Sequence, residues 1–149
     1  MSNTFKVVRR HSGYYSGDSY SETGFKPSRT LPSIGNPLGN PPYPGRTAVG
    51  GENWVDFLTT TYNNSLILTY NFAWGGATID AELVTPGQGI SLTNEVNTFL
   101  NKFASKPPPT PWRTDNTLFS VWMGINDIGY SYNQVDDLNT YVPPLHRAS

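Results

Sequence analysis

The apolar positions of the chain gather in four segments, separated by loops rich in proline, glycine and polar residues. Residues 53–62 and 92–104 place their apolar side chains three and four positions apart, the spacing of amphipathic helices. Residues 65–73 and 117–123 are short and rich in apolar, β-branched and aromatic side chains, a pattern typical of buried strands. Helices that alternate with apolar strands predict an α/β fold, with a parallel sheet and helices on its faces.

Three stretches predict loops instead of regular structure. Residues 26–47 are dense in proline and glycine, residues 104–112 contain a run of three prolines, and the tail after Gly129 is polar. The start of the chain is harder to assign. Residues 9–16 are polar and interrupted by glycine, so they predict a first strand that is poor or disrupted.

The composition narrows the classes of function. A length of 149 residues suits one compact domain with its own core. The formal net charge of −1 argues against binding to nucleic acid or to an anionic membrane surface. Aromatic residues make up 13% of the chain and charged residues 14%, which fits a protein that handles neutral polar ligands such as sugars, or simply an aromatic core.

Several kinds of site are excluded or lack support. Because the chain has no cysteine, it contains neither disulfides nor cysteine-ligated metal. No group of His, Asp and Glu residues has the spacing of metal ligands, and we expect no cofactor. No run of 18 apolar residues is present, so we expect no membrane-spanning segment. Residues 1–12 lack the apolar core of a signal peptide.

Two short motifs carry candidate chemistry. Gly17-Asp18-Ser19-Tyr20-Ser21 presents a serine on a tight turn, which makes Ser19 a candidate nucleophile. Gly124-Ile125-Asn126-Asp127 follows an apolar strand, and the Asn126 side-chain amide is a candidate donor to a developing oxyanion. A Gly-Gly pair between them also follows a predicted strand. Because parallel sheets place their sites at the carboxyl ends of strands, these motifs indicate ester hydrolysis at one edge of the sheet.

In this order the motifs resemble the sequence blocks of the GDSL or SGNH hydrolases. The family's second block resembles Asn71-Phe72-Ala73-Trp74-Gly75-Gly76-Ala77-Thr78, and the resemblance assigns Gly76 to the oxyanion hole together with Asn126. It also implies a flavodoxin-like three-layer α/β sandwich. The recognisable blocks lie within residues 17–129.

Four further residues of these motifs are expected to support the site: Gly17, Asp18, Gly124 and Asp127. We expect Asp18 to brace the turn instead of acting as the base, because its backbone adjoins Ser19 and its carboxylate points elsewhere. Asp127 is likewise expected to be structural. The serine therefore needs a separate proton acceptor.

Two further stretches narrow the resemblance. Gly35-Asn36-Pro37-Leu38-Gly39-Asn40-Pro41-Pro42-Tyr43-Pro44-Gly45 and Asn53-Trp54-Val55-Asp56-Phe57-Leu58 are similar to fungal acetylesterases of carbohydrate esterase family 16. Those enzymes are secreted and remove acetyl groups from plant-wall oligosaccharides. The resemblance therefore implies a small-molecule or oligosaccharide ester as substrate, and an extracellular location.

The family's fourth block, an Asp-x-x-His pair that activates the serine, is not found in this sequence. His11 precedes the nucleophile in a basic stretch and is expected to be a solvated surface residue. His146 follows Pro143, which cannot act as the acid, and it stands where the family carries Asp in a Val-Pro-Pro segment. We therefore expect residues 1–149 to form a single incomplete domain, whose C-terminal part is missing and which is inactive or nearly so.

Two other functions remain open at this point. The chain is also compatible with a carbohydrate-binding remnant, in which Tyr43, Trp74 and Trp112 hold sugar without chemistry, although each ring also suits packing against the sheet or a loop. A phosphate- or nucleotide-binding α/β domain is the other alternative. It has little support, because neither Gly-x-Gly-x-x-Gly nor Gly-Lys-Ser/Thr occurs.

Overall fold

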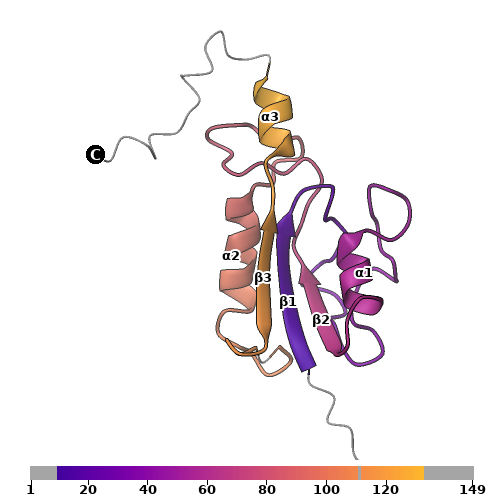
Figure 1. Ribbon diagram of the computed structural model, residues 1–149. Coiled ribbons are helices and arrows are strands. Elements are labelled where there is room, and N and C mark those ends of the chain that lie inside the picture. The colour runs from indigo at the N-terminus through magenta and orange to yellow at the C-terminus, as the bar shows by residue number, and fades with distance from the viewer. Residues whose placement is uncertain (1–9, 111, 133–149) are drawn as a thin grey trace, which may run out of the picture.

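Three parallel strands form the sheet, with β1 (Arg10–Gly17) in the centre and β2 (Leu66–Asn71) and β3 (Thr117–Trp122) on either side. The computed structural model describes residues 10–110 and 112–132. Figure 1 shows α1 and α2 on opposite sides of the sheet and α3 beyond the carboxyl ends of the strands. This arrangement confirms the predicted α/β fold with helices on both faces. In chain order the elements are β1 (Arg10–Gly17), α1 (Trp54–Thr60), β2 (Leu66–Asn71), α2 (Leu92–Lys102), β3 (Thr117–Trp122) and α3 (Ile125–Ser131).

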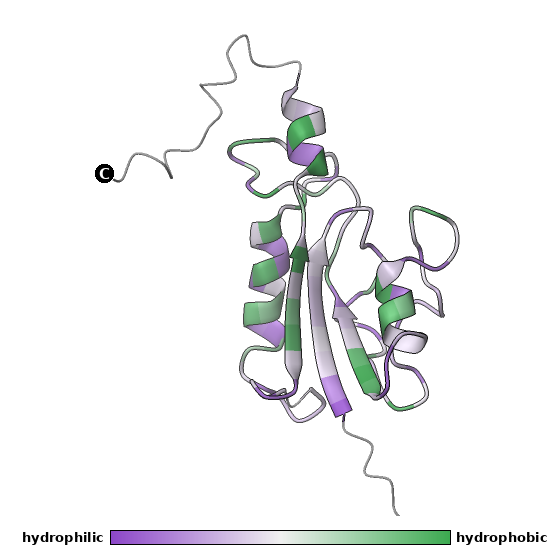
Figure 2. Ribbon diagram, viewed as in Figure 1, coloured by the Kyte–Doolittle hydropathy of each residue, from purple (hydrophilic) through white to green (hydrophobic). Residues whose placement is uncertain are grey.

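The prediction of a poor or disrupted first strand is wrong. β1 is the central strand and pairs with β2 over Arg10–Tyr15 and with β3 over Ser12–Gly17. Its hydropathy is intermediate along most of its length, as Figure 2 shows, so the strand has no strong apolar signal. The tyrosines nevertheless bury their rings, with Tyr14 and Tyr15 only 3% and 1% exposed. Gly13 is required, since an added Cβ would lie 2.5 Å from the Tyr15 ring.

The hydrophobic core lies between the sheet and α2. Tyr14 stacks on Tyr70 with ring centroids 4.8 Å apart, and Phe103 packs against both rings. Such aromatic pairs add to the stabilisation from burial of their apolar area. Only part of the predicted apolar stripe of α2 contributes, because Val96 and Leu100 are exposed.

The opposite face of the sheet packs against α1. The Tyr15 and Trp54 rings meet edge to face at 5.6 Å, and the hydroxyls of Thr59 and Thr69 lie 2.6 Å apart. Asn53 caps the helix, because its side chain accepts from the backbone N–H groups of residues 55 and 56. The helix is therefore shorter than the predicted residues 53–62, with the cap just outside it.

β3 departs from the prediction in its burial. The segment is a strand, as predicted, but its large apolar side chains are about half exposed: Leu118, Phe119, Val121 and Trp122. β3 lies at the edge of the sheet, and within the described residues no further strand pairs with its outer side. The prediction of a fully buried strand is therefore wrong for this part of the molecule.

Two further predictions concern connections. Residues 26–47 contain no helix or paired strand of the sheet, as their proline and glycine content indicates. The polar tail was expected to begin after Gly129, whereas α3 continues to Ser131. Tyr132 N–H still donates to the carbonyl of Ile128, so the helical hydrogen bonds carry the chain past that glycine. None of the helices in the described ranges has the length and hydrophobicity needed to cross a membrane.

Candidate active site

The turn that carries Ser19 follows directly after β1. The carbonyl of Asp18 accepts hydrogen bonds from the backbone N–H groups of Ser21 and Glu22, both at 3.0 Å. The Asp18 carboxylate accepts from Tyr20 N–H at 3.0 Å and is completely buried. Asp18 thus holds the turn from inside, in keeping with the predicted bracing role. Ser19 is half-buried at the carboxyl edge of the sheet.

The loop that carries Gly76 is fastened to the end of β1. Trp74 N–H donates to the carbonyl of Gly17 at 3.1 Å, two residues before Ser19. Gly76 has φ +77°, which favours glycine, and its carbonyl accepts from Gly87 N–H at 3.1 Å. Its own N–H has no acceptor among the residues that the structure describes. That group is free to donate to a substrate oxygen.

Asn126 lies in the first turn of α3, directly after the carboxyl end of β3. Its side-chain Nδ2 donates to the carbonyl of Ala77 at 2.8 Å, which joins α3 to the Gly76 loop. An amide nitrogen carries two N–H groups, so one remains for a ligand. The next residue, Asp127, also joins α3 to the segment after Gly76, because its carboxylate accepts from Ile79 N–H at 2.9 Å. This contact agrees with the structural role expected for Asp127.

The structure therefore brings the three predicted blocks to one edge of the sheet. Gly17 pairs with Trp122 of β3 and accepts from Trp74, and Asn126 reaches Ala77. Gly124 is the N-cap residue of α3 and has φ +121°, a conformation that favours glycine, so it sets the turn from β3 into the helix. The positions of the motifs are now established, while the chemical roles of Ser19, Gly76 and Asn126 stay predictions.

Glu95 was not identified from the sequence, although it lies beneath the turn that carries Ser19. It projects from α2, is 2% exposed, and accepts from Gly17 N–H at 2.9 Å. Burial raises its pKa to about 8, and the nearby Asp18 charge adds to that rise. The signal was its spacing: Glu95 stands three residues after Leu92 and four before Phe99, within the apolar stripe of the helix.

Asp18 shares this buried acidic environment. Its pKa is raised, mainly by burial and further by the negative charge of Asp127. The carboxylate oxygens Asp18 Oδ2, Glu95 Oε1 and Asp127 Oδ2 are buried and have no hydrogen-bond partner among the described residues. Acidic groups thus lie close together below Ser19: the Asp127 charge raises the pKa of Asp18, and the Asp18 charge raises the pKa of Glu95.

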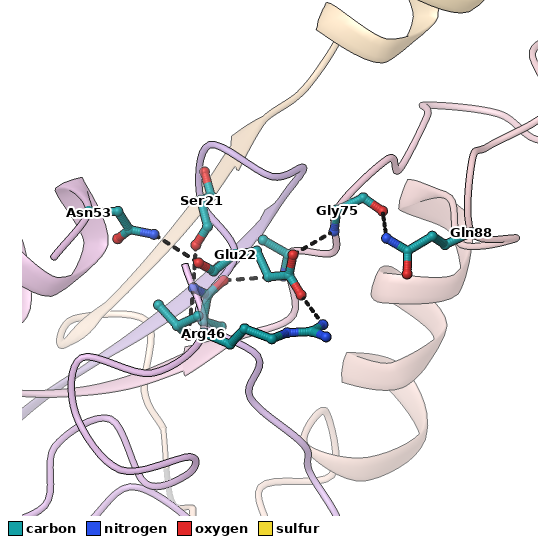
Figure 3. Close-up of polar contacts among 9 residues, drawn as sticks. Ser21, Glu22, Arg46, Asn53, Gly75 and Gln88 are labelled. Atoms are coloured by element: carbon teal, nitrogen blue, oxygen red, sulfur yellow. Dashed lines mark hydrogen bonds and ion pairs between the residues drawn. The ribbon is translucent and has the colours of Figure 1, made fainter. Parts of the chain in front are cut away.

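Another buried carboxylate, that of Glu22, positions the loop before Gly76. Glu22 accepts from Gly75 N–H at 3.1 Å with one oxygen and from the Arg46 guanidinium at 2.6 Å with the other. Gln88 donates to the carbonyl of Gly75 at 3.0 Å, so both polar groups of that glycine are held. Asn53 donates to the Glu22 carbonyl at 2.9 Å (Figure 3). Glu22 therefore ties the Gly76 loop to Asn53 at the start of α1 and to Arg46.

Within the described residues no histidine lies beside Ser19. His11 is half-buried near the start of β1, at the opposite edge of the sheet from Ser19, and lines a hollow of about 350 Å³ that Asp115 also lines. The expectation of a fully solvated His11 is therefore only partly met. His146 lies outside the described residues. Within the described ranges no group of three His, Asp or Glu side chains is placed to hold a metal ion.

The three aromatic residues considered for sugar binding have different surroundings. Trp112 packs against Tyr14 and Phe99 and donates to the carbonyl of Phe103, so it anchors the core. Tyr43 is 47% exposed on the proline-rich loop. Trp74 is half-buried next to the Gly76 loop and borders two hollows, which leaves it as the ring of the three best placed to meet a ligand.

Comparison with known proteins agrees with this geometry. Residues 16–147 match the family described as GDSL-like Lipase/Acylhydrolase. The chain belongs to this family. It is also 53% identical over 115 residues to a protein named "Acetylesterase" from Thermothelomyces thermophilus. That match covers 76% of this chain and 38% of the relative, so the chain spans less than half the length of that protein. Family membership confirms the predicted resemblance to the GDSL hydrolases.

Proposed function

We propose that this chain supplies the nucleophile and the oxyanion-binding groups of an acetylesterase that acts on acetylated oligosaccharides. Ser19 Oγ attacks the carbonyl carbon of the acetyl ester and gives up its proton to a base. When the tetrahedral intermediate collapses, the C–O bond to the sugar breaks and the sugar oxygen takes up that proton. The acetyl group stays on Ser19 until water hydrolyses it to acetate. The N–H groups of Ser19 and Gly76 and the Asn126 amide stabilise the oxyanion of that intermediate. Each such donor contributes about 3–4 kcal/mol of transition-state stabilisation.

One observation carries the proposal: three loops from separate parts of the chain meet at one sheet edge through their own hydrogen bonds. The Ser19 turn is joined to the Gly76 loop by the bond from Trp74 to Gly17. The Gly76 loop is joined to α3 by the bond from Asn126 to Ala77. Preorganised donors of this kind are effective because they need no reorganisation during the reaction.

The described residues do not supply the base. His11 lies at the other edge of the sheet, and the buried carboxyls near Ser19 already serve the turn and its neighbours. The proposal therefore assigns to residues 10–132 the attack and the oxyanion binding, and not the activation of the serine. An unactivated serine reacts slowly, so free imidazole in solution can replace the missing base in an experiment.

The test follows acetyl transfer to Ser19 itself. The folded chain is incubated with p-nitrophenyl acetate and imidazole, and mass spectrometry of its peptides reports which serines become acetylated. We expect Ser19 to be acetylated much faster than the exposed Ser28, and Asn126→Ala to slow Ser19 by about 10²–10³-fold. Asn64→Ala, a change in an exposed loop, should leave the rate unchanged. Equal acetylation of Ser19 and Ser28, or no effect of Asn126→Ala, would overturn the proposal.

A further inference from the structure

Three of the ten Lys and Arg residues in the chain border one hollow beside the candidate site. The hollow has a volume of about 360 Å³ and is lined by Gly24, Lys26, Arg29, Asn40, Pro41, Arg46 and Trp74. None of these seven lining residues is acidic. In a chain with a net charge of −1, this concentration of positive charge indicates a site for an anionic group.

The backbone that presents two of these cations is firmly held. The buried Asn40 side chain accepts from Lys26 N–H at 3.1 Å and donates to the Lys26 carbonyl at 3.0 Å and to the Thr30 carbonyl at 2.8 Å. Arg29 N–H donates to the Lys26 carbonyl at 3.0 Å, which closes a turn. The amide of Asn40 is thus fully used inside the loop. Its role is to fix the positions from which Lys26 and Arg29 extend.

Arg46 is oriented by two contacts and keeps donors for a ligand. Its guanidinium bonds Glu22 at 2.6 Å and lies 5.7 Å from the Trp74 ring centroid. A guanidinium carries five N–H groups in a fixed plane, and its fork matches a carboxylate. The Arg46 side chain remains 66% exposed, so solvent and ligands reach it. Even when the negative charge of Glu22 is included, Lys26, Arg29 and Arg46 together carry a net positive charge.

This hollow is coupled to the candidate active site through two residues. Trp74, in its wall, donates to the carbonyl of Gly17 and stands two positions before Gly76. Glu22 bonds both Arg46 and Gly75 (Figure 3). A second hollow of about 300 Å³ shares Lys26 and Trp74 and has Phe25 and Phe72 in its lining. Trp74 therefore stands between a cationic hollow and a more apolar one.

We propose that the cationic hollow binds the carboxylate of a uronic acid unit in the acetylated oligosaccharide. Arg46 and Arg29 pair with the carboxylate, Lys26 adds charge, and the Trp74 ring provides an apolar surface for the sugar ring. This inference rests on the proposed function and specifies it further. The substrate class becomes acidic oligosaccharides whose acetyl ester lies close to a uronate. Neutral acetylated sugars bind the same site more weakly.

The experiment measures binding by calorimetry, with the full chain carrying Ser19→Ala so that no ester is consumed. The ligands are a xylo-oligosaccharide with one glucuronate branch and the same oligosaccharide without the branch. At low ionic strength we expect the branched sugar to bind about ten-fold more tightly. The double change Lys26→Gln and Arg29→Gln should abolish that preference. Lys102→Gln with Arg113→Gln removes the same charge elsewhere and should preserve it.

Two results would overturn the inference. One is equal affinity for the branched and the unbranched sugar in a chain whose thermal unfolding shows it to be folded. The other is displacement of the branched sugar by inorganic sulfate as effectively as by free glucuronate, which would reveal a general anion site. Binding does not depend on Ser19 reactivity. A failed acetylation of Ser19 would therefore count against the proposed function alone.

Discussion

Glu95 and Asp18 place two buried carboxyl groups beneath the turn that carries Ser19. Glu95 has the stronger effect on stability, because its pKa is about 8 in the folded protein against an ordinary value of 4.5. Between these values the folded chain keeps a proton that the unfolded chain has lost. The free energy of unfolding therefore falls as pH rises from about 4.5 to about 8, by at most about 1.4 kcal/mol per pH unit from this group.

Replacement of Glu95 tests this account directly. Glu95→Gln keeps an oxygen for Gly17 N–H but cannot ionise, so we expect its stability to vary less with pH across that window. Denaturant unfolding at a series of pH values measures the slope. Charged and titratable neighbours such as Asp18 and Lys26 stay unchanged in the variant, and the exposed Glu82→Gln serves as the control. A variant slope equal to that of the unmodified chain would contradict the assignment.

The sequence identified the residues at the candidate site only where a local motif carried the signal. Ser19, Gly76 and Asn126 belong to short blocks, and the structure places all three at the predicted sheet edge. The sequence did not identify Glu95 and Glu22 as part of the site, because the residues that they contact are distant in sequence. Gly17 is 78 positions from Glu95, and Gly75 is 53 positions from Glu22. Contacts of this kind depend on the completed fold and not on neighbouring residues.

At the level of elements, the sequence predicted the type of the two amphipathic segments (helices) and of the two apolar segments (strands), but it did not predict β1 as a regular strand. The centre of β1 contains Ser12, Gly13, Tyr14 and Tyr15, which look polar along the chain. Pairing with a strand on each side satisfies the backbone, and the tyrosine rings supply apolar area that hydropathy understates. The strand is therefore specified by its neighbours more than by its own pattern.

Asn53 makes two contacts at the start of α1 that a substitution can test. Its side chain caps α1 and also donates to the carbonyl of Glu22, which joins the helix to the segment after Ser19. We expect Asn53→Ala to lower the free energy of unfolding by about 1–2 kcal/mol, since a cap and a buried hydrogen bond are lost together. Denaturant unfolding measures the change. Asn64→Ala removes an exposed amide and should have almost no effect; equal losses in both variants would refute the role of the cap.

At the scale of the whole molecule, the two outer strands of the sheet, β2 and β3, differ in how they are covered. The proline-rich segment covers part of β2, where Thr69 N–H donates to the carbonyl of Pro37. At β3, apolar side chains on both faces are about half exposed, and the described residues place no strand beyond it. The region that aligns with this chain, at 53% identity, forms 38% of the Thermothelomyces acetylesterase. Exposed apolar strands at a sheet edge promote association with other chains.

The isolated 149-residue chain should therefore self-associate through β3. Sedimentation velocity at increasing concentration should show species larger than the monomer. Leu118→Lys with Val121→Lys places a charge on each face of the strand, at side chains that are 53% and 60% exposed, and should shift the chain toward monomer. Thr60→Lys with Thr61→Lys adds the same charge at exposed positions around the end of α1. If both pairs reduce association equally, net charge is the cause and the β3 edge is not the contact.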